Sequence, residues 1–370
     1  ATRTRLTSVW VVHCVRSHPH LVDFRERIQV QGDMISKEDT MRLGNRLLSM
    51  DFGVYPTMFD YCLAMALLYF KEQKCDVVIL ETGLGGTYDS TNACGVPDVT
   101  VIAKIGFDHM AILGDTLAKI AAEKAGIIKH GTALVLESQE KEAMDVLNKA
   151  AERADIETTK VINLDEIRIL PQKDGKQCFS YAGYNAVTMK MLGVHQYENA
   201  VAAMLAAELF FEKYFAGKKN VPERKALQYA IREGIDRTQW MGRMELVSND
   251  PFFLMDGAHN SNGVEALKKS LETMYPDEKF HFIMGVMADK DYGEMIRELL
   301  PLALDFKTVT VESERALQGE ALADCIREKG IPAEAYQNLA DVLPDFSKSS
   351  TENRHHVASS VFDEQAVVET

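Results

Sequence analysis

Long apolar runs are absent from this sequence. No stretch approaches the roughly 20 apolar residues that a membrane-spanning helix needs. Excess positive charge is absent too, because 41 Lys and Arg face 55 Asp and Glu and give a formal net charge of −14. Such a surface repels phosphate at long range, which argues against nucleic-acid and anionic-membrane partners while leaving local basic pockets possible. We therefore expect no nucleic-acid partner, no membrane association and a cytoplasmic location.

Closely spaced cysteines are also lacking. The six cysteines are scattered and form no CxxC pair, so the spacing indicates neither a zinc site nor a disulfide framework. Several lie in apolar or helix-like surroundings, and we expect reduced, buried thiols, as in a cytoplasmic protein. The positions are Cys14, Cys62, Cys75, Cys94, Cys178 and Cys325.

Internal repeats and low-complexity segments are absent as well, and 370 residues are too many for one ordinary core. Strand-like and helix-like segments alternate, which is typical of a mostly parallel sheet covered by helices. Apolar residues at helical spacing predict helices at 58–72, 117–128, 141–154, 196–215, 222–233, 263–274, 292–300 and 319–329. Apolar runs predict strands at 76–80, 99–105, 133–137, 252–255, 280–287 and 306–311, with antiparallel hairpins within 160–192.

The predicted domain boundary lies near residues 245–250. Turn formers interrupt the alternation there, and the second half of the chain then restarts it. We therefore predict an α/β protein with a first domain at 1–246 and a smaller second domain at 247–370. The run 76–80 reads as a buried parallel strand of the first domain.

A glycine-rich loop follows that strand. Glu81 stands where the strand ends, and Gly83, Gly85 and Gly86 come directly after it. In open α/β sheets, ligands bind at the carboxyl ends of the strands, and glycine lets a backbone approach a ligand closely. Taken alone, however, such a loop is as consistent with simple turn geometry as with binding.

The next predicted strand also ends in polar residues, Asp108 and His109. Two neighbouring strand ends would then offer a carboxylate and an imidazole at one edge of the sheet. That pair fits a nucleotide-associated Mg²⁺ better than a closed zinc site. A hydrogen-bonded core histidine is the alternative interpretation of His109.

Lys124 lies near the end of the following predicted helix. A solvated helix lysine is the ordinary interpretation. The apolar Ala-Gly-Ile that follows it indicates instead a segment that packs inward and draws the lysine toward the sheet edge. A lysine held beside metal-bound oxygens would pair with phosphate or become modified.

Four segments together resemble those of folylpolyglutamate synthases and dihydrofolate synthases, which belong to the Mur ligase superfamily. They are PHLVDFRERIQV at 19–30, LETGLGGTYDSTN at 80–92, IGFDHMAILGDTLAKIAAEKAGIIK at 105–129 and DGAHN at 256–260. HQYENA at 195–200, MGRMELV at 241–247 and ADKD at 288–291 match in order and spacing. The resemblance covers about residues 19–345. It implies a P-loop-type ATPase domain with a mostly parallel sheet, followed by a smaller, Rossmann-like α/β glutamate-ligase domain.

The resemblance also implies roles for individual residues. Glu81 and His109 match the magnesium ligands of the family, and Lys124 matches a lysine that family members carry as a carbamate beside the second metal. Residues matching ATP contacts are Asn199, Arg243 and Asp256, with His259 of the same DGAHN motif. Residues matching the pterin and folate contacts are Thr57, Phe59, Asp60, Tyr88, Asp89 and Ser90, while Arg25 and Arg27 could pair with substrate carboxylates.

The implied chemistry is carboxylate activation with ATP and Mg²⁺. ATP would phosphorylate a folate-linked carboxylate, and the amine of L-glutamate would attack the acyl phosphate. Neutralising charge on the transferring phosphoryl group is the main catalytic task in such reactions. The expected partners are these small molecules alone, and we expect a monomer, as is usual in the family.

The match stops before Pro19. The family carries a GTNGKGS-type phosphate-binding loop upstream of that point, whereas residues 1–18 contain no GxxxxGK[ST] and residues 1–17 no glycine. We accordingly expect the first domain to lack its P-loop and its first strand. Ser17 could replace the serine that family members use on magnesium only if the backbone shifts.

Three interpretations of function follow. The first is a ligase that adds L-glutamate to a folate, to dihydropteroate or to both. The second is a catalytically inactive, truncated or frameshifted member of the same family. The third is another Mur-type ligase, such as one that builds peptidoglycan, against which the PHLVDFRERI segment argues.

Overall fold

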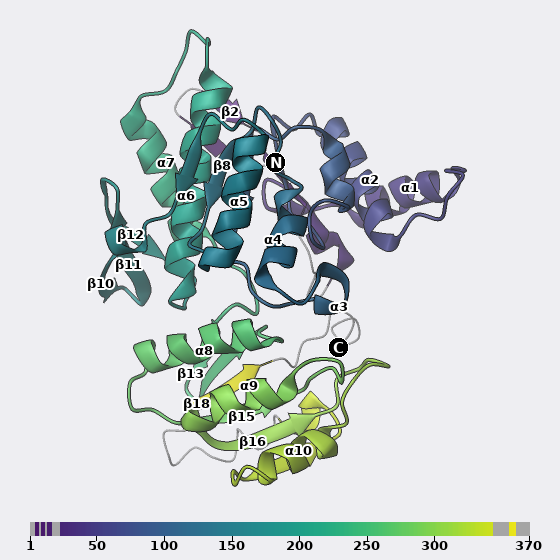
Figure 1. Ribbon diagram of the computed structural model, residues 1–370, viewed down its shortest axis with the longest axis vertical. Coiled ribbons are helices and arrows are strands. Elements are labelled where there is room, and N and C mark those ends of the chain that lie inside the picture. The colour runs from purple at the N-terminus through teal and green to yellow at the C-terminus, as the bar shows by residue number, and fades with distance from the viewer. Residues whose placement is uncertain (1–3, 7–8, 12, 17–22, 343–354, 360–370) are drawn as a thin grey trace. The chain divides into compact units, whose positions relative to one another are not determined.

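The computed structural model describes residues 4–6, 9–11, 13–16, 23–342 and 355–359 (Figure 1). Two compact units are present. The first contains residues 1–165 and 199–234, and the second contains residues 166–198 and 235–370. Because each unit combines separate stretches of chain, the predicted boundary after residue 246 stays a prediction.

The first unit contains one mostly antiparallel sheet and one parallel sheet, both short. In the first sheet the order is β5-β4-β3-β6, with β6 parallel to β3. In the second sheet β7, β8 and β9 are all parallel. The strands are β3 (His13–Arg16), β4 (Ile28–Val30), β5 (Asp33–Met34), β6 (Val77–Leu80), β7 (Val99–Ile102), β8 (Ala133–Leu136) and β9 (Thr159–Val161), and β1 (Thr4–Leu6) and β2 (Val9–Val11) form a separate antiparallel pair.

Helices bury the apolar faces of these sheets. One core lies between β4 and the helices α1 and α2, and a second lies between β7, β8 and the helices α4 and α5. Figure 1 shows α4 and α5 side by side. The helices are α1 (Lys37–Leu48), α2 (Met58–Glu72), α3 (Met110–Leu113), α4 (Leu117–Ala125), α5 (Lys141–Arg153), α6 (His195–Phe215) and α7 (Arg224–Arg237), with short 3-10 turns η1 (Phe24–Arg27), η2 (Ser90–Cys94) and η3 (Leu164–Glu166).

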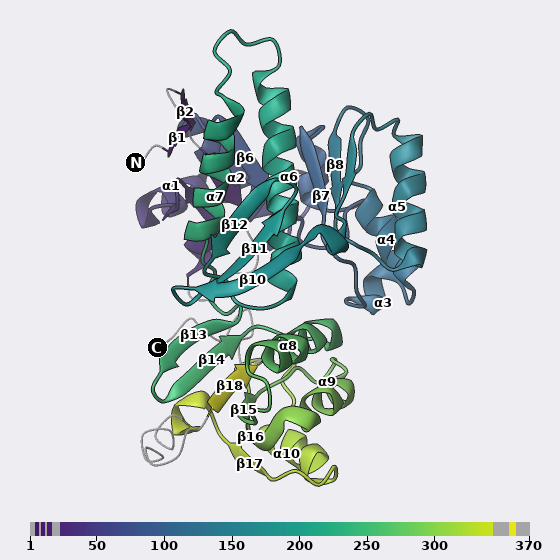
Figure 2. The same cartoon turned by 90° about the vertical axis from the view of Figure 1, so that its left-hand side faces the viewer.

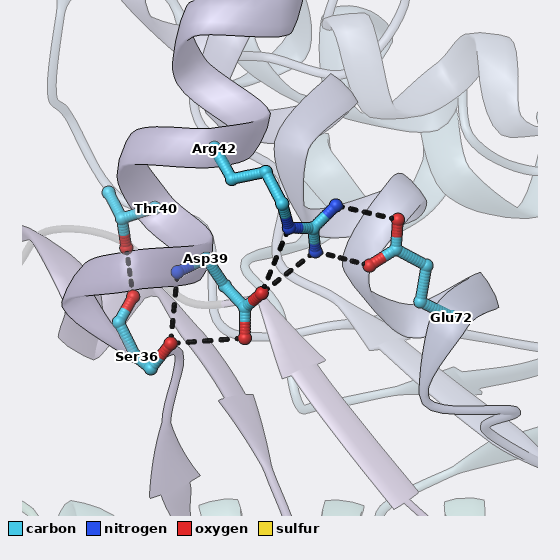
Figure 3. A network of polar contacts seen from close by, with 5 residues as sticks. All are labelled: Ser36, Asp39, Thr40, Arg42 and Glu72. Carbon is cyan, nitrogen blue, oxygen red and sulfur yellow. Dashed lines mark hydrogen bonds and ion pairs between the residues drawn. The ribbon is translucent and has the colours of Figure 1, made fainter.

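An ion-pair network joins α1 to the end of α2 (Figure 3). Ser36 caps α1 by accepting from Asp39 N at 2.9 Å, and the Asp39 carboxylate faces Arg42 at 2.8 Å. Arg42 also donates to both carboxylate oxygens of Glu72, the last residue of α2. Hydrogen bonds from Arg42 hold the pKa of Asp39 and of Glu72 below their usual values. The network fixes how the two helices pack on one another.

The second unit contains a six-stranded sheet in the order β13-β14-β18-β15-β16-β17, parallel except for β13. Its core is formed by apolar residues of the strands and of the covering helices. An antiparallel ladder, β10-β11-β12, belongs to the same unit (Figure 2). The strands are β10 (Arg168–Lys173), β11 (Lys176–Tyr181), β12 (Tyr184–Met189), β13 (Glu245–Asn249), β14 (Phe252–Asp256), β15 (Phe280–Met284), β16 (Ala303–Val309), β17 (Ala333–Tyr336) and β18 (His355–Ser359), and the helices are α8 (Ser261–Met274), α9 (Tyr292–Leu299), α10 (Gly319–Arg327) and the 3-10 turn η4 (Leu300–Leu302).

Three expectations need correction. The strand predicted at 76–80 forms, but it is not buried, because it ends the sheet order, and Val78 and Ile79 are 43% and 53% exposed. A strand was not expected before Pro19, yet His13–Arg16 forms β3 and pairs with both β4 and β6. Reduced, buried thiols were expected throughout, but Cys75 is bonded in a disulfide and Cys94 is exposed.

Among the described helices, none has the length and apolar character to cross a bilayer.

Candidate functional site

The loop after β6 is organised by the Asp89 carboxylate. One oxygen accepts from the backbone N–H groups of Gly83 and Leu84 at 2.9 and 3.0 Å, and the other accepts from Thr91 N at 2.9 Å and from its hydroxyl. A carboxylate that accepts several N–H bonds holds a loop in one conformation. Asp89, which the resemblance assigns to substrate binding, therefore has a clear structural role in shaping the loop.

This loop packs so closely against the last turn of α4 that there is no room for a side chain at the glycines of the contact. A Cβ added to Gly86 would lie 2.7 Å from Glu123 O, and one added to Gly126 would lie 2.3 Å from Thr87 Oγ1. Thr87 N donates to Glu123 O at 2.9 Å across the same contact. The two glycines are therefore required for the close approach of the loop to the helix, and the ligand-binding interpretation is not needed to explain them.

Lys124 lies at this contact, and its side chain is partly buried. Burial lowers the pKa of the Lys124 amine, while the nearby carboxylates of Asp108 and Asp89 oppose that shift. Desolvation favours the neutral amine, and a neutral amine is the form that reacts with electrophiles such as CO₂. The prediction that this lysine turns inward is consistent with its burial.

His109 adopts a left-handed backbone conformation, with φ 49° and ψ 36°, at the start of α3. Asp108 Oδ1 accepts from His109 N at 2.8 Å, and the imidazole Nε2 lies 3.9 Å from Asp108 Oδ2. The His109 side chain is about half exposed, so the core-histidine interpretation is wrong. Non-glycine residues in this conformation cluster at functional sites.

Glu81 is the first residue after β6 and is exposed. Within the described residues, no group of three or more His, Cys, Asp and Glu side chains is arranged to hold a metal ion. A set made of Glu81, His109 and a modified Lys124 contains only two side chains of these types and is therefore a different kind of site. The convergence of these three side chains stays a prediction.

The residues predicted to contact the pterin meet at the start of α2. Thr57 and Asp60 form a capping box, with Thr57 N donating to Asp60 Oδ2 at 2.7 Å. Ser90 Oγ donates to the other Asp60 oxygen, so η2 is tied to α2, and these hydrogen bonds, from Ser90 first, lower the pKa of Asp60. The Phe59 ring lies against Gly83, and Tyr88 is 90% exposed.

The two arginines of the predicted folate segment differ in environment. Arg25 pairs with Asp23, with Nη2 at 2.7 Å from Oδ2, and this hydrogen bond lowers the pKa of the Asp23 carboxyl. Arg27 is only 8% exposed at the end of η1. Ser17, the third residue predicted near this segment, lies outside the described residues.

In the second unit the structure brings together Arg243, Asp256 and His259. Asp256 is 6% exposed and accepts from Met244 N at 2.8 Å and Ala258 N at 2.9 Å. Burial raises its pKa, and the positive charges of Arg243 and His259 oppose that shift. Three of the four predicted nucleotide residues are therefore close to one another. The fourth, Asn199, is exposed in the second turn of α6, in the first unit.

Sequence reasoning did not identify several residues that hold these loops. Asn92 and Lys129 hold the loop after β6, while Glu137 and Gln139 hold the turn after β7 by accepting from Lys104 N and Ile105 N at 2.8 Å. His195, at the start of α6, is near Arg243, and burial followed by the charge of Arg243 lowers its pKa to about 4. The only available signal was that Asn92, Lys129 and His195 fall inside the family-like segments.

Comparisons with known proteins agree with this architecture. The family model for the Mur ligase middle domain matches residues 55–207, and the model for the Mur ligase glutamate ligase domain matches residues 242–357. The dihydrofolate synthase/folylpolyglutamate synthase of Bacillus subtilis is 37% identical over 322 residues, which cover 83% of this chain and 72% of the relative. A folylpolyglutamate synthase of Arabidopsis thaliana is 35% identical over 68% of this chain, but the chain spans only 44% of that relative.

Solved structures share the fold. The Mycobacterium tuberculosis folylpolyglutamate synthase complexed with ADP matches with a TM-score of 0.81 and 27% identity, over 95% of this chain and 82% of that one. The α/β fold predicted from the sequence is thereby confirmed, and so is the family resemblance. The chain belongs to the folylpolyglutamate synthase and dihydrofolate synthase family of Mur-type, ATP-dependent, amide-forming ligases.

Proposed function

We propose that this chain joins L-glutamate to a folate, to dihydropteroate or to both, with ATP as the activating substrate. The observation that carries the proposal is the partly buried Lys124, whose pKa is lowered where α4 meets the glycine-rich loop and two carboxylates. The names of the relatives support the substrate class, and the ADP complex of the Mycobacterium tuberculosis relative supports the nucleotide.

The chemistry of the donor set fits Mg²⁺. A carboxylate from Glu81, the His109 imidazole and a carbamate on Lys124 would hold it, because a carbamate replaces the amine with oxygen donors that a hard cation prefers. When bound, Mg²⁺ neutralises charge on a transferring phosphoryl group. The lowered pKa of Lys124 favours the neutral amine that such a modification requires.

The remaining predicted residues would bind and orient the substrates. Thr57, Asp60 and Ser90 form one hydrogen-bonded group at the start of α2, and the Phe59 ring lies against Gly83. The exposed Tyr88 ring is a further candidate for substrate contact. Arg243, Asp256 and His259 would bind the nucleotide, and Asn199 is a separate predicted nucleotide contact. Arg27 would pair with a substrate carboxylate. We further propose that the protein is a cytoplasmic monomer.

Incorporation of radiolabelled L-glutamate tests this function. Purified chain is supplied with ATP, Mg²⁺ and either dihydropteroate or tetrahydrofolate, and Lys124→Met is compared with Lys119→Met. Lys119 lies on the same helix but is exposed and pairs only weakly with Asp115, so its removal should have little effect.

The expected result is ATP-dependent product from at least one acceptor, lowered about 100-fold or more in Lys124→Met, which is the scale for loss of a charge-stabilising group. No product from either acceptor, in a chain shown to be folded, would support the inactive interpretation. Equal rates for Lys124→Met and wild type would remove Lys124 from the site.

A further inference from the structure

Lys129 is held between two backbone carbonyls of the loop after β6. Its Nζ donates to Gly95 O at 2.7 Å and also to Asn92 O. Lys129 follows α4 by four residues, whereas both acceptors lie at the end of η2. A charged donor makes hydrogen bonds roughly twice as strong as a neutral one. The amine therefore fastens the far end of the loop to the segment that follows α4.

Asn92 continues this connection to the helix itself. Its side-chain amide donates to Gly126 O at 3.2 Å and to Thr87 O at 3.1 Å. Gly126 closes the last turn of α4, and Thr87 in turn donates from N and Oγ1 to Glu123 O. A continuous set of hydrogen bonds thus runs from Lys129 through Asn92 to Glu123 and Gly126, which lie on either side of Lys124 in the sequence.

We propose that Lys129, acting through Asn92, is a positioning residue that fixes the loop of residues 83–95 against the last turn of α4 and thereby keeps Lys124 in its partly buried place. The inference deepens the proposed function, because it names what holds the lysine on which that function depends. Neither Lys129 nor Asn92 is assigned any contact with substrate.

The packing makes Lys124 sensitive to this attachment. The loop touches α4 so closely that a Cβ on Gly86 would lie 3.1 Å from Lys124 Cα. If the loop moved away from the helix, this contact would open and water would reach the Lys124 amine. Asp89 lies on the same loop and would move with it.

Lys213 provides a matched control. Its Nζ also donates to two backbone carbonyls of the first unit, Asp98 O at 3.2 Å and Gly131 O. These acceptors lie outside the 83–95 loop and outside α4. Lys213→Met therefore removes the same kind of contact, with a similar cost in stability, without releasing the loop.

The test compares wild type with Lys129→Met, Lys129→Arg and Lys213→Met. Attachment of the loop is followed by hydrogen–deuterium exchange of the peptides that cover residues 83–95 and 117–128, and kcat, KM and Tm are measured in parallel. In Lys129→Met we expect both peptides to exchange faster, because the backbone hydrogen bond from Thr87 N to Glu123 O is no longer held in place. We also expect kcat to fall about 10- to 100-fold, as for a misplaced group. Lys129→Arg should restore both properties in part, while Lys213→Met should lower Tm comparably and change neither.

Unchanged exchange of these peptides together with unchanged kcat in Lys129→Met would overturn the inference, and so would an equal effect of Lys213→Met. If Lys129→Met does not fold, Asn92→Ala removes the connection to Gly126 and should speed exchange of the same peptides; no change in that variant would also overturn the inference. If wild type makes no product while Lys129→Met still exchanges faster, the proposed function fails and the positioning role stands.

Discussion

At the scale of residues, the His109 backbone is left-handed, as are those of Gln31, Lys74 and Asp155 in the first unit. A left-handed conformation at a residue with a side chain costs roughly 1–3 kcal/mol and persists only where its surroundings enforce it. Here the Asp108 carboxylate accepts from His109 N, and α3 begins at the next residue. No sequence pattern predicts this conformation, because it depends on contacts that form only in the fold.

The pKa of His195 gives a residue-level prediction for stability against pH. Burial lowers this pKa from 6.5 to about 4, so the folded protein keeps the imidazole neutral where the unfolded chain protonates it. Between pH 6.5 and pH 4 the unfolded state therefore binds more protons, and stability falls as the pH falls. Relative to its value above pH 6.5, the free energy of unfolding falls by about 3 kcal/mol near pH 4 because of this one imidazole.

Urea unfolding of wild type and His195→Gln between pH 4 and 8 measures this effect. The variant has no imidazole to protonate, so its free energy of unfolding should depend less steeply on pH in that window. Equal slopes for the two proteins would show that His195 is not held neutral by the fold. Because Gly193 approaches the imidazole closely, the comparison concerns the slope and not the absolute stability.

At the scale of elements, local patterns predicted most of the fold. The helix predicted at 58–72 is α2 to the residue, because its apolar spacing and its Thr57 cap agree. The strand predicted at 99–105 ends at 102, because side chains of Glu137 and Gln139 rather than a neighbouring strand bind the next backbone groups. The strand β18 was not predicted, since its place between β14 and β15 depends on pairing with segments far away in sequence.

The candidate site was predicted only in part, because it too depends on contacts between segments that are distant in the sequence. Motifs pointed to the loop and to Lys124, which lie in contact in the structure, but the role of the glycines depends on how closely two elements approach, which a linear sequence does not contain. The same limit applies to Lys129, whose partners are backbone carbonyls with no side-chain signature.

Gly126→Ala tests the approach of α4 to the loop. The backbone of Gly126 is right-handed helical, with φ −59°, so alanine is conformationally acceptable and would favour the helix by up to about 1 kcal/mol. Its Cβ would, however, lie 2.5 Å from Thr87 Cα, and such overpacking costs about 1–3 kcal/mol. We expect net destabilisation of about 1–2 kcal/mol in urea unfolding.

Gly234→Ala is the control for that substitution. This glycine lies in α7, and an added Cβ would meet nothing within 4 Å. Helix propensity alone should therefore act, and the variant should be more stable than wild type by up to about 1 kcal/mol. If both variants were stabilised alike, the close contact between Gly126 and Thr87 would be refuted.

At the scale of the whole molecule, two features act in opposite directions on contact between copies of the chain. They are the open sheet edges of the first unit and the overall charge. Among the described strands, β6 and β7 each have a neighbour on one side only. Both carry exposed apolar residues, namely Val78 and Ile79 on β6 and Val101 on β7. Exposed apolar edge strands are templates for pairing with another chain. The net charge of −14 opposes such contact between copies, and salt screens that repulsion.

We therefore predict that the proposed monomer begins to self-associate only as protein concentration and ionic strength rise. Sedimentation velocity between about 0.05 and about 1 M NaCl measures this, because the screening length falls over that range from above 10 Å to about 3 Å. Ile79→Lys places a charge on the β6 edge and should suppress association, because an edge lysine disfavours strand pairing. Val54→Lys is the control, since Val54 is 72% exposed but lies in the loop between α1 and α2, outside any strand. If Val54→Lys suppressed association as strongly, general hydrophobicity and not the strand edge would be responsible. A single monomeric species at every salt concentration would instead show that the edge is not open to a second copy.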